Sequence, residues 1–205
     1  VMPISHPLAE AAHRDGARRV VVTGSGLART EHFHPGAPLS SAPDGKRRIF
    51  YLGDDRPRKG LQEVLGAVRL LLPTLPDMQL VIASKRALKL PSDLPCELHV
   101  QPDDRQLADL YRSSNLFVSA SWGEGLGYPP LEAMACGVPT VITDSVGVRD
   151  YAQDGGNCLL VPLRDVPALA QAMRRVLDDP ALAARLAQTG LQTAAAYNWD
   201  AVIDR

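Results

Sequence analysis

Residues 121–139, SWGEGLGYPPLEAMACGVP, decide the fold class of this chain. An apolar run at residues 116–120 precedes them, so the pattern predicts a strand that feeds a helix through a glycine turn. The start of such a helix offers unpaired backbone N–H groups, and glycines let a ligand approach the backbone closely. This turn suits a diphosphate, and its two carboxylates, Glu124 and Glu132, suit the hydroxyls of a sugar.

Strand and helix patterns alternate on both sides of this stretch. We expect strands at residues 49–52, 80–83, 97–101, 116–120, 138–143 and 158–161. We expect helices at residues 59–72, 130–136 and 146–151, and others that start at Asp103 or Asp104, near Asp165 and at Pro180. Alternation of helices with near-continuous apolar strands is typical of a parallel sheet covered on both faces. The sequence therefore predicts an α/β fold with a Rossmann-like parallel sheet, whose ligands bind beyond the carboxyl ends of the strands.

The first part of the chain follows a weaker pattern. Residues 8–17 predict a helix and residues 19–23 a strand, whereas residues 24–46 are rich in Gly, Pro, Ser and His. A loop of that length is uncommon inside one compact domain, so we interpret it as an interdomain linker. The stretch TGSGLAR within it mimics a dinucleotide fingerprint, but Arg29 replaces the third glycine and no helix pattern follows.

Composition excludes several classes of function. The net charge of −1 and the aromatic content of 5% argue against a nucleic-acid partner. Cys96, Cys136 and Cys158 form no C-x-x-C pair, which favours reduced thiols in a cytoplasmic protein. His32 and His34 form an H-x-H pair with no third ligand evident, so we expect no metal site. We see neither a signal peptide nor an apolar run of the ~18 residues that span a membrane.

The string EGLGYPPLEAMACGVP, residues 124–139, closely resembles the nucleotide-binding signature of retaining GT-B glycosyltransferases of group 1, the family 4-like class. In that family, E-G-(F/L)-G-x-(P/x)-x-x-E-A-x-A-x-G-x-P lies at the donor site of the C-terminal domain. The resemblance implies that residues 37–197 form a nucleotide-sugar-binding domain, the C-terminal half of a GT-B fold. Residues 1–36 would then be a remnant of the N-terminal acceptor domain plus the hinge, and residues 198–205 the start of a C-terminal crossover helix.

The same resemblance assigns roles to residues of the string. It implies that Glu124 contacts the hydroxyls of the donor sugar and acts in catalysis. The backbone N–H groups around Gly125, Leu126 and Gly127 would hold the diphosphate. Glu132 would accept hydrogen bonds from the ribose hydroxyls, because a carboxylate is an acceptor that can take two hydroxyls.

Lys59 is a second catalytic candidate, in the stretch GDDRPRKG after the first strand of the main domain. Family members usually carry a lysine followed by glycine there, and its ammonium would neutralise charge on the leaving diphosphate. The family also tends to place an arginine directly after the glycine of that strand, where this chain has Asp54. Either Arg56 or Arg58 substitutes as a donor-binding residue, or the phosphate clamp is weaker. In the alternative interpretation, these charges form a solvated turn.

A third set of candidates concerns the nucleobase. By analogy with the family, the base would stack near the loop ends that carry Lys85 and Gln101, and near Leu107. A lysine at a strand end is more often merely exposed. Residues 143–150 resemble the loop that helps to shape the sugar pocket in the family.

The resemblance implies transfer of a sugar from a nucleoside-diphosphate sugar to a hydroxyl acceptor, with retention of configuration. The leaving phosphate would help to deprotonate the acceptor, so no residue needs to be a nucleophile. No Asp-x-Asp motif stands near the site, so we expect neither a metal nor another cofactor. The chain starts at Val1, and we interpret it as a fragment that lacks its acceptor domain, binds nucleotide weakly and transfers nothing. Any peripheral membrane contact would run through the absent domain, and the acceptor stays open.

Two other classes of function stay open at this point. A degenerate GT-B domain could serve as a scaffold, which would ignore nucleoside diphosphates. A GT-B relative such as an epimerase or a phosphorylase is the other alternative, and a phosphorylase would carry a lysine-bound pyridoxal cofactor.

Overall fold

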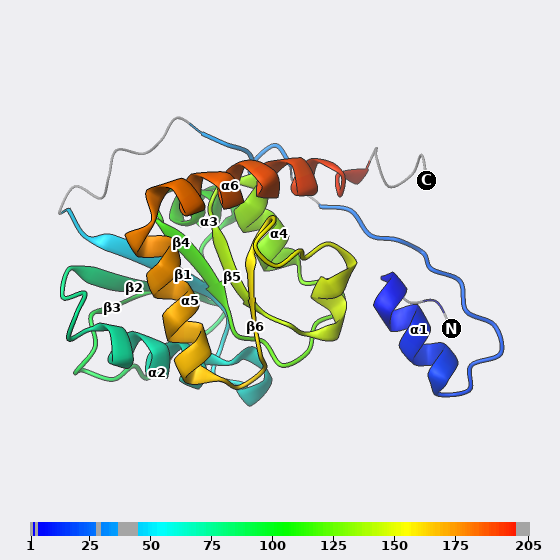
Figure 1. The fold of residues 1–205 in the computed structure, drawn as a ribbon, viewed down its shortest axis with the longest axis horizontal. Helices are drawn as coiled ribbons and strands as arrows, with labels where there is room; N and C mark the ends of the chain where they lie inside the picture. The colour runs from blue at the N-terminus through cyan, green and yellow to red at the C-terminus, as the bar shows by residue number, and fades with distance from the viewer. Residues whose placement is uncertain (1, 3, 28–29, 37–44, 200–205) are drawn as a thin grey trace.

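The computed structural model describes residue 2 and residues 4–27, 30–36 and 45–199. Six parallel strands form one sheet in the order β3-β2-β1-β4-β5-β6, with helices on both faces (Figure 1). The strands are β1 (Arg47–Leu52), β2 (Met78–Ser84), β3 (Cys96–Val100), β4 (Leu116–Ser119), β5 (Thr140–Thr143) and β6 (Leu159–Val161). The helices are α1 (His6–Arg14), α2 (Leu61–Leu71), α3 (Asp104–Arg112), α4 (Tyr128–Ala135), α5 (Val166–Asp178) and α6 (Pro180–Ala195), with 3₁₀ turns η1 (Pro57–Lys59) and η2 (Val146–Asp150). The predicted Rossmann-like α/β fold is confirmed.

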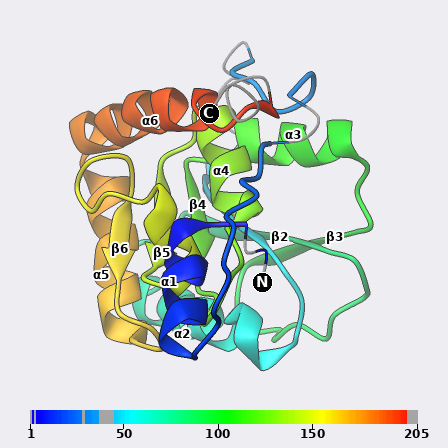
Figure 2. The same cartoon turned by 90° about the vertical axis from the view of Figure 1, so that its right-hand side faces the viewer.

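The centre of the sheet is buried on both faces because its strands are mostly apolar there, whereas the edge strand β3 is only partly buried. On β1, Ile49 and Tyr51 pack into a core layer shared with α2 and α5. The residue between them, Phe50, packs into the opposite layer, which is shared with α3 and α4. Successive side chains on a strand point to opposite faces, so an unbroken apolar run supplies both layers at once. Figure 2 shows α3 and α4 on one side of the sheet and α2 on the other.

Helix α6 links the two layers. Its start follows from sequence, because Asp179 accepts a hydrogen bond from the backbone N–H of Leu182 and Pro180 takes the first turn. Leu182 and Leu186 belong to the layer of α5, whereas Ala194 near its end belongs to the layer of α4. The helix therefore runs across the end of the sheet (Figure 1).

The first 27 residues contain a helix close to the predicted one, as α1, but not the predicted strand. The predicted strand at residues 19–23 is wrong, because the chain there is irregular and Val21 is exposed. Valine-rich segments form strands only where a neighbouring strand supplies a surface to pack on. Among the described residues of this segment, the single bridge joins Leu27 to Asn198. The predicted boundary at residue 37 and most of the predicted helix at 198–205 lie outside the described residues.

Candidate functional site

The strand order of the sheet reverses between β1 and β4, which makes this place the topological switch point. From β1 the chain proceeds to β2 and β3 on one side, whereas β4 leads to β5 and β6 on the other. The helices that follow β1 and β4 therefore cover opposite faces of the sheet, and the loops before them diverge. A crevice at the carboxyl ends of such strands is the usual ligand site of this fold. The corresponding position in this chain, which we call the crevice, lies between the β1–α2 loop (residues 53–60) and the β4–α4 loop (residues 120–127).

Lys59 and Glu124 meet across this crevice. The Lys59 Nζ atom lies 2.7 Å from Glu124 Oε1. The two side chains are only 18% and 16% exposed, so water screens their attraction less than at an open surface. The structure thus brings together the two residues predicted to be catalytic, from loops on adjacent strands.

The β1–α2 loop is held in place by a hydrogen bond from Tyr51 and by close contact with the β4–α4 loop. The Tyr51 hydroxyl donates to the carbonyl oxygen of Lys59 at 3.0 Å. Burial raises the pKa of Tyr51 well above its ordinary value, so this hydroxyl keeps its proton at neutral pH. Gly60 has a φ of 72°, and a Cβ there would overlap the carbonyl oxygen of Ala120. The close approach of the two loops therefore requires glycine after the lysine.

Asp54 takes the position where the resemblance leads one to expect arginine, and it binds Arg56. The Arg56 Nε and Nη2 atoms lie 2.8 and 2.6 Å from its two oxygens. The hydrogen bonds from Arg56 lower the pKa of this buried carboxyl to about 2. Arg56 itself is half exposed, whereas Arg58 is exposed and accepts a hydrogen bond from the Trp122 backbone N–H at its carbonyl oxygen.

The start of α4 has fewer N–H donors than the sequence pattern suggests. Gly127 precedes the helix with a φ of 85°, and no side chain caps it. Tyr128 is the first helical residue, so Pro129 and Pro130 occupy the next two positions and carry no N–H group. The donors that can face an anion here are therefore the backbone N–H groups up to Tyr128, including those of Gly125 and Leu126.

The loop after β5, which the resemblance assigns to the wall of the sugar pocket, contacts the β4–α4 loop. The Thr143 hydroxyl donates to the carbonyl oxygen of Ser121 at 2.6 Å. A Cβ on Gly147 would overlap the carbonyl oxygens of Glu124 and Gly125, so η2 lies directly against their backbone. This contact restricts the position of the Glu124 backbone in the crevice.

The N-terminal segment also touches the glycine turn. The Ser5 hydroxyl donates to the carbonyl oxygen of Gly125 at 3.0 Å, and Ser5 is fully buried. The backbone N–H of His6 donates to Asp150, and α1 packs against η2, beside the sheet (Figures 1 and 2). Sequence reasoning missed Ser5, because nothing in its local pattern signals a contact 120 residues away.

Glu132 lies deeper in α4 than expected. It is the fifth residue of the helix, so it belongs to the second turn, and the first turn contains no acidic residue. A complement to the helix dipole therefore does not explain it. Its side chain is half-buried, and Oε2 accepts a hydrogen bond from the Tyr111 hydroxyl at 3.0 Å. Tyr111 is a buried residue of α3, and its place in that helix does not by itself show where its hydroxyl points.

The three predicted nucleobase residues lie along the β2 and β3 side of the same sheet edge. Gln101 donates from Nε2 to the carbonyl oxygen of Lys85 at 3.1 Å, and its φ of 52° is left-handed. Lys85 is exposed. Leu107 is the fourth residue of α3 and is half-buried. It packs against the core layer that contains this helix.

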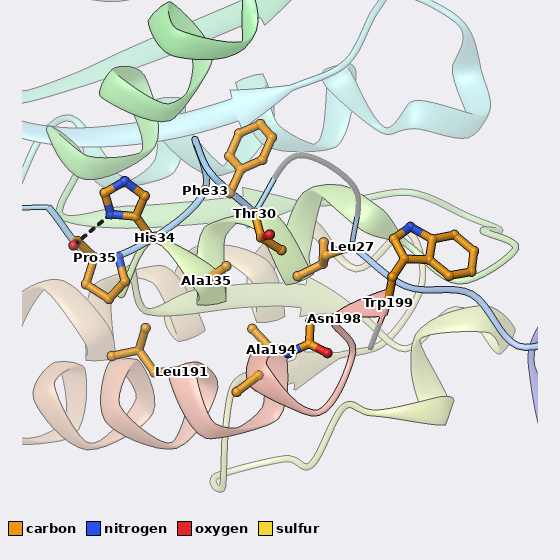
Figure 3. A pocket seen from close by; sticks show the side chains of 11 residues that line it. Leu27, Thr30, Phe33, His34, Pro35, Ala135, Leu191, Ala194, Asn198 and Trp199 are labelled. Carbon is orange, nitrogen blue, oxygen red and sulfur yellow. Dashed lines mark hydrogen bonds between the residues drawn. The ribbon is translucent and has the colours of Figure 1, made fainter. Parts of the chain in front are cut away.

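A separate cavity of about 540 Å³ lies between a wall formed by Leu27 and residues 30–35 and the end of α6 (Figure 3). Leu27, Phe33 and Pro35 line one side of it, and Leu191 lies on the other. None of the predicted site residues lines this cavity. In the part of the chain that the structure describes, no helix is long and apolar enough to cross a bilayer.

Comparison with known proteins identifies the family. A D-inositol 3-phosphate glycosyltransferase from Thermobispora bispora is 29% identical, over an alignment that covers 91% of this chain and 49% of that protein. A phosphatidyl-myo-inositol mannosyltransferase from Mycolicibacterium smegmatis is 30% identical over 172 residues, covering 80% of this chain and 45% of the relative. The chain thus spans about half the length of the curated relatives it matches.

The fold agrees with this relationship. A solved structure of sucrose-phosphate synthase from Thermosynechococcus elongatus matches with a TM-score of 0.84 at 27% identity. The match covers 98% of this chain and 55% of that one. The family model described as glycosyl transferases group 1 matches residues 39–193, which include both loops of the crevice. The chain belongs to the glycosyl transferases group 1 family.

Proposed function

We propose that this chain is the donor-binding part of a retaining glycosyltransferase, which moves a sugar from a nucleoside-diphosphate sugar to a hydroxyl acceptor. The observation that carries the proposal is the Lys59–Glu124 ion pair at the point where the sheet reverses its progression. The names of the relatives, a mannosyltransferase and a glycosyltransferase among them, agree with sugar transfer. Because the chain spans about half of those proteins, the acceptor side would be supplied by residues outside it.

In this proposal, the ion pair opens when the donor binds. The Lys59 ammonium exchanges the carboxylate of Glu124 for the diphosphate, so the crevice never leaves a half-buried cation without a counter-charge. Glu124 is then free to accept hydrogen bonds from the hydroxyls of the sugar. As the sugar leaves, negative charge grows on the diphosphate next to Lys59, and a preorganised cation in a poorly hydrated crevice stabilises that charge.

The backbone of the β4–α4 loop completes the diphosphate site in this proposal. With two prolines in the first turn of α4, the N–H groups of Gly125, Leu126, Gly127 and Tyr128 are the donors at hand. We assign the second cation to Arg56. Its pKa is raised first by its hydrogen bonds with Asp54 and, more weakly, by the charge of Glu124, which lies within electrostatic range.

The remaining parts of the proposal follow from position. Lys85, Gln101 and Leu107 would line the base end of the nucleotide, on the β2 and β3 side of the crevice. No cofactor or metal enters this scheme, because charge neutralisation rests on Lys59 and Arg56. The three cysteines are unpaired, which agrees with a cytoplasmic location.

A calorimetric titration tests the proposal. The 205-residue chain is titrated with UDP, GDP and ADP, and each of the corresponding nucleoside-diphosphate glucoses competes with the diphosphate that binds. Saturable binding of one diphosphate, displaced by its sugar conjugate, supports a donor site. A chain that ignores all three diphosphates is the scaffold described above, and the proposal is then wrong.

A further inference from the structure

The hydroxyl of Tyr111 touches α4 at two points. It lies 3.0 Å from Glu132 Oε2 and 3.1 Å from the carbonyl oxygen of Pro129. Tyr111 comes from α3 and is fully buried, so water does not compete for its proton. Burial, followed by the charge of Glu132, raises the pKa of Tyr111 well above its ordinary value. The phenol therefore stays protonated and donates, and its one proton is shared between two acceptors on the same helix.

Packing holds this hydroxyl in one place. The Tyr111 ring meets the edge of Phe50 at a centroid distance of 4.8 Å and lies 5.3 Å from Phe117. Phe33, which lines the cavity of Figure 3, closes another side at 5.9 Å. Three aromatic neighbours leave the ring little rotational freedom, so the position of its oxygen is set by the core and not by the ligand.

A glutamate on a helix surface has several rotamers, and fixing one of them costs conformational free energy. Glu132 is half-buried, and the Tyr111 hydroxyl selects an orientation in which Oε2 faces α3. A carboxylate oxygen has two lone pairs, so this bond leaves acceptor capacity on the group. One hydrogen bond from Tyr111 can therefore orient the carboxylate without occupying all of its acceptor positions.

We propose that Tyr111 is a positioning residue, which holds the Glu132 carboxylate in the orientation that receives the two hydroxyls of a ribose. This inference rests on the proposed function, because it requires a nucleotide in the crevice. Tyr111 does not touch the ligand in this scheme; it reduces the ordering that Glu132 must undergo on binding. Loss of the phenol oxygen should weaken ribose recognition by about threefold to tenfold, the equivalent of ordering one long side chain.

The test compares two forms of one ligand. The nucleoside diphosphate that binds the wild-type chain best is titrated beside its 2′,3′-dideoxy counterpart. The Kd of the dideoxy ligand divided by the Kd of the ribonucleotide measures ribose recognition. The variants are Tyr111→Phe, which keeps the ring, and Glu132→Ala. Tyr197→Phe is the control, because it also removes a tyrosine hydroxyl, one that donates to Asp150 at the end of η2 and not to Glu132.

We expect Tyr111→Phe to lower the ratio by about threefold to tenfold through the ribonucleotide alone, with the dideoxy Kd unchanged. The dideoxy Kd also reports that the variant is folded. In Glu132→Ala, the two ligands should bind equally, so the ratio of their Kd values should fall to about one. The Tyr111→Phe/Glu132→Ala double variant should give the same ratio as Glu132→Ala, and Tyr197→Phe should give the wild-type ratio. A purely structural bond between α3 and α4 would lower the free energy of unfolding without changing the ratio, and that result overturns the inference.

Two further results separate this inference from the proposed function. If the wild-type protein binds both ligands equally, the ribose hydroxyls are not recognised. The proposed positioning role of Tyr111 is then wrong, whereas the proposed donor site is still supported. If the wild type binds no nucleoside diphosphate, the proposed function fails and the inference fails with it.

Discussion

Lys59 Nζ lies 2.7 Å from Glu124 Oε1, although the two residues are 65 positions apart in the chain. Each belongs to a loop that leaves the carboxyl end of a strand, and those strands, β1 and β4, are neighbours in the sheet. The helices after them cover opposite faces of the sheet, so the loops diverge, and these two side chains join one loop to the other. A cation and an anion placed this way can exchange partners with an anionic ligand that carries hydroxyls.

Glu132→Ala should weaken binding of a nucleoside diphosphate by about 1–3 kcal/mol, because the ribose hydroxyls lose a charged acceptor. Calorimetric titration measures the change. Glu10→Ala, at an exposed position in α1, is the matched control and should bind as the wild type does. Unchanged affinity in Glu132→Ala would count against the ribose assignment.

Gly147→Ala should displace the β4–α4 loop. A Cβ at this position would overlap the carbonyl oxygens of Glu124 and Gly125, so the backbone must move. We expect a loss of about 1–3 kcal/mol in the free energy of unfolding, together with weaker nucleotide binding. Urea denaturation and calorimetry measure the two effects. Gly123→Ala is the control, because a Cβ there has no heavy atom within 4 Å, and equal behaviour of the two variants would refute the bracing role of η2.

Asp54 should make stability depend on pH in the acid range. Its pKa is about 2 in the folded protein against an ordinary value of 3.8, so the folded state binds the proton less readily than the unfolded state. The stability that Asp54 contributes is therefore complete above about pH 4 and is lost as the pH falls toward 2. Between these limits, the wild type should lose stability more steeply than Asp54→Asn.

Urea denaturation at a series of pH values measures this slope. Asp55→Asn, at the exposed neighbouring position, is the control and should follow the wild-type slope. Parallel curves for wild type and Asp54→Asn would show that the Asp54–Arg56 pair does not stabilise the folded state.

The fold was largely predictable from sequence, because the strands other than β3 contain apolar runs that burial on both faces explains. The pairing of Lys59 with Glu124 was within reach for the same reason, since both residues follow strands and the carboxyl ends of parallel strands share one edge. The loss of two N–H donors at Pro129 and Pro130 could also have been read from the chain, once the helix start was known to be Tyr128.

Other features depend on contacts that no local pattern records. The bond from Tyr111 to Glu132 joins two helices, and the bond from Ser5 to Gly125 joins distant parts of the chain. An apolar face of α3 predicts that Tyr111 is buried but not where its hydroxyl points. The error at residues 19–23 has a related cause, because β-propensity reflects the surface that a strand packs on, and none of the strands in the described part of the chain pairs with this segment.

The affinity of Lys59→Met for the best-binding nucleoside diphosphate tests the central claim most directly. Removal of the ammonium takes away a charge-assisted contact with the diphosphate and leaves Glu124 to repel it. The account predicts binding weaker by about 1.5–3 kcal/mol, with Lys89→Met, at an exposed position, equal to the wild type. Wild-type affinity in Lys59→Met would contradict it, because the diphosphate would then bind somewhere other than the crevice between β1 and β4.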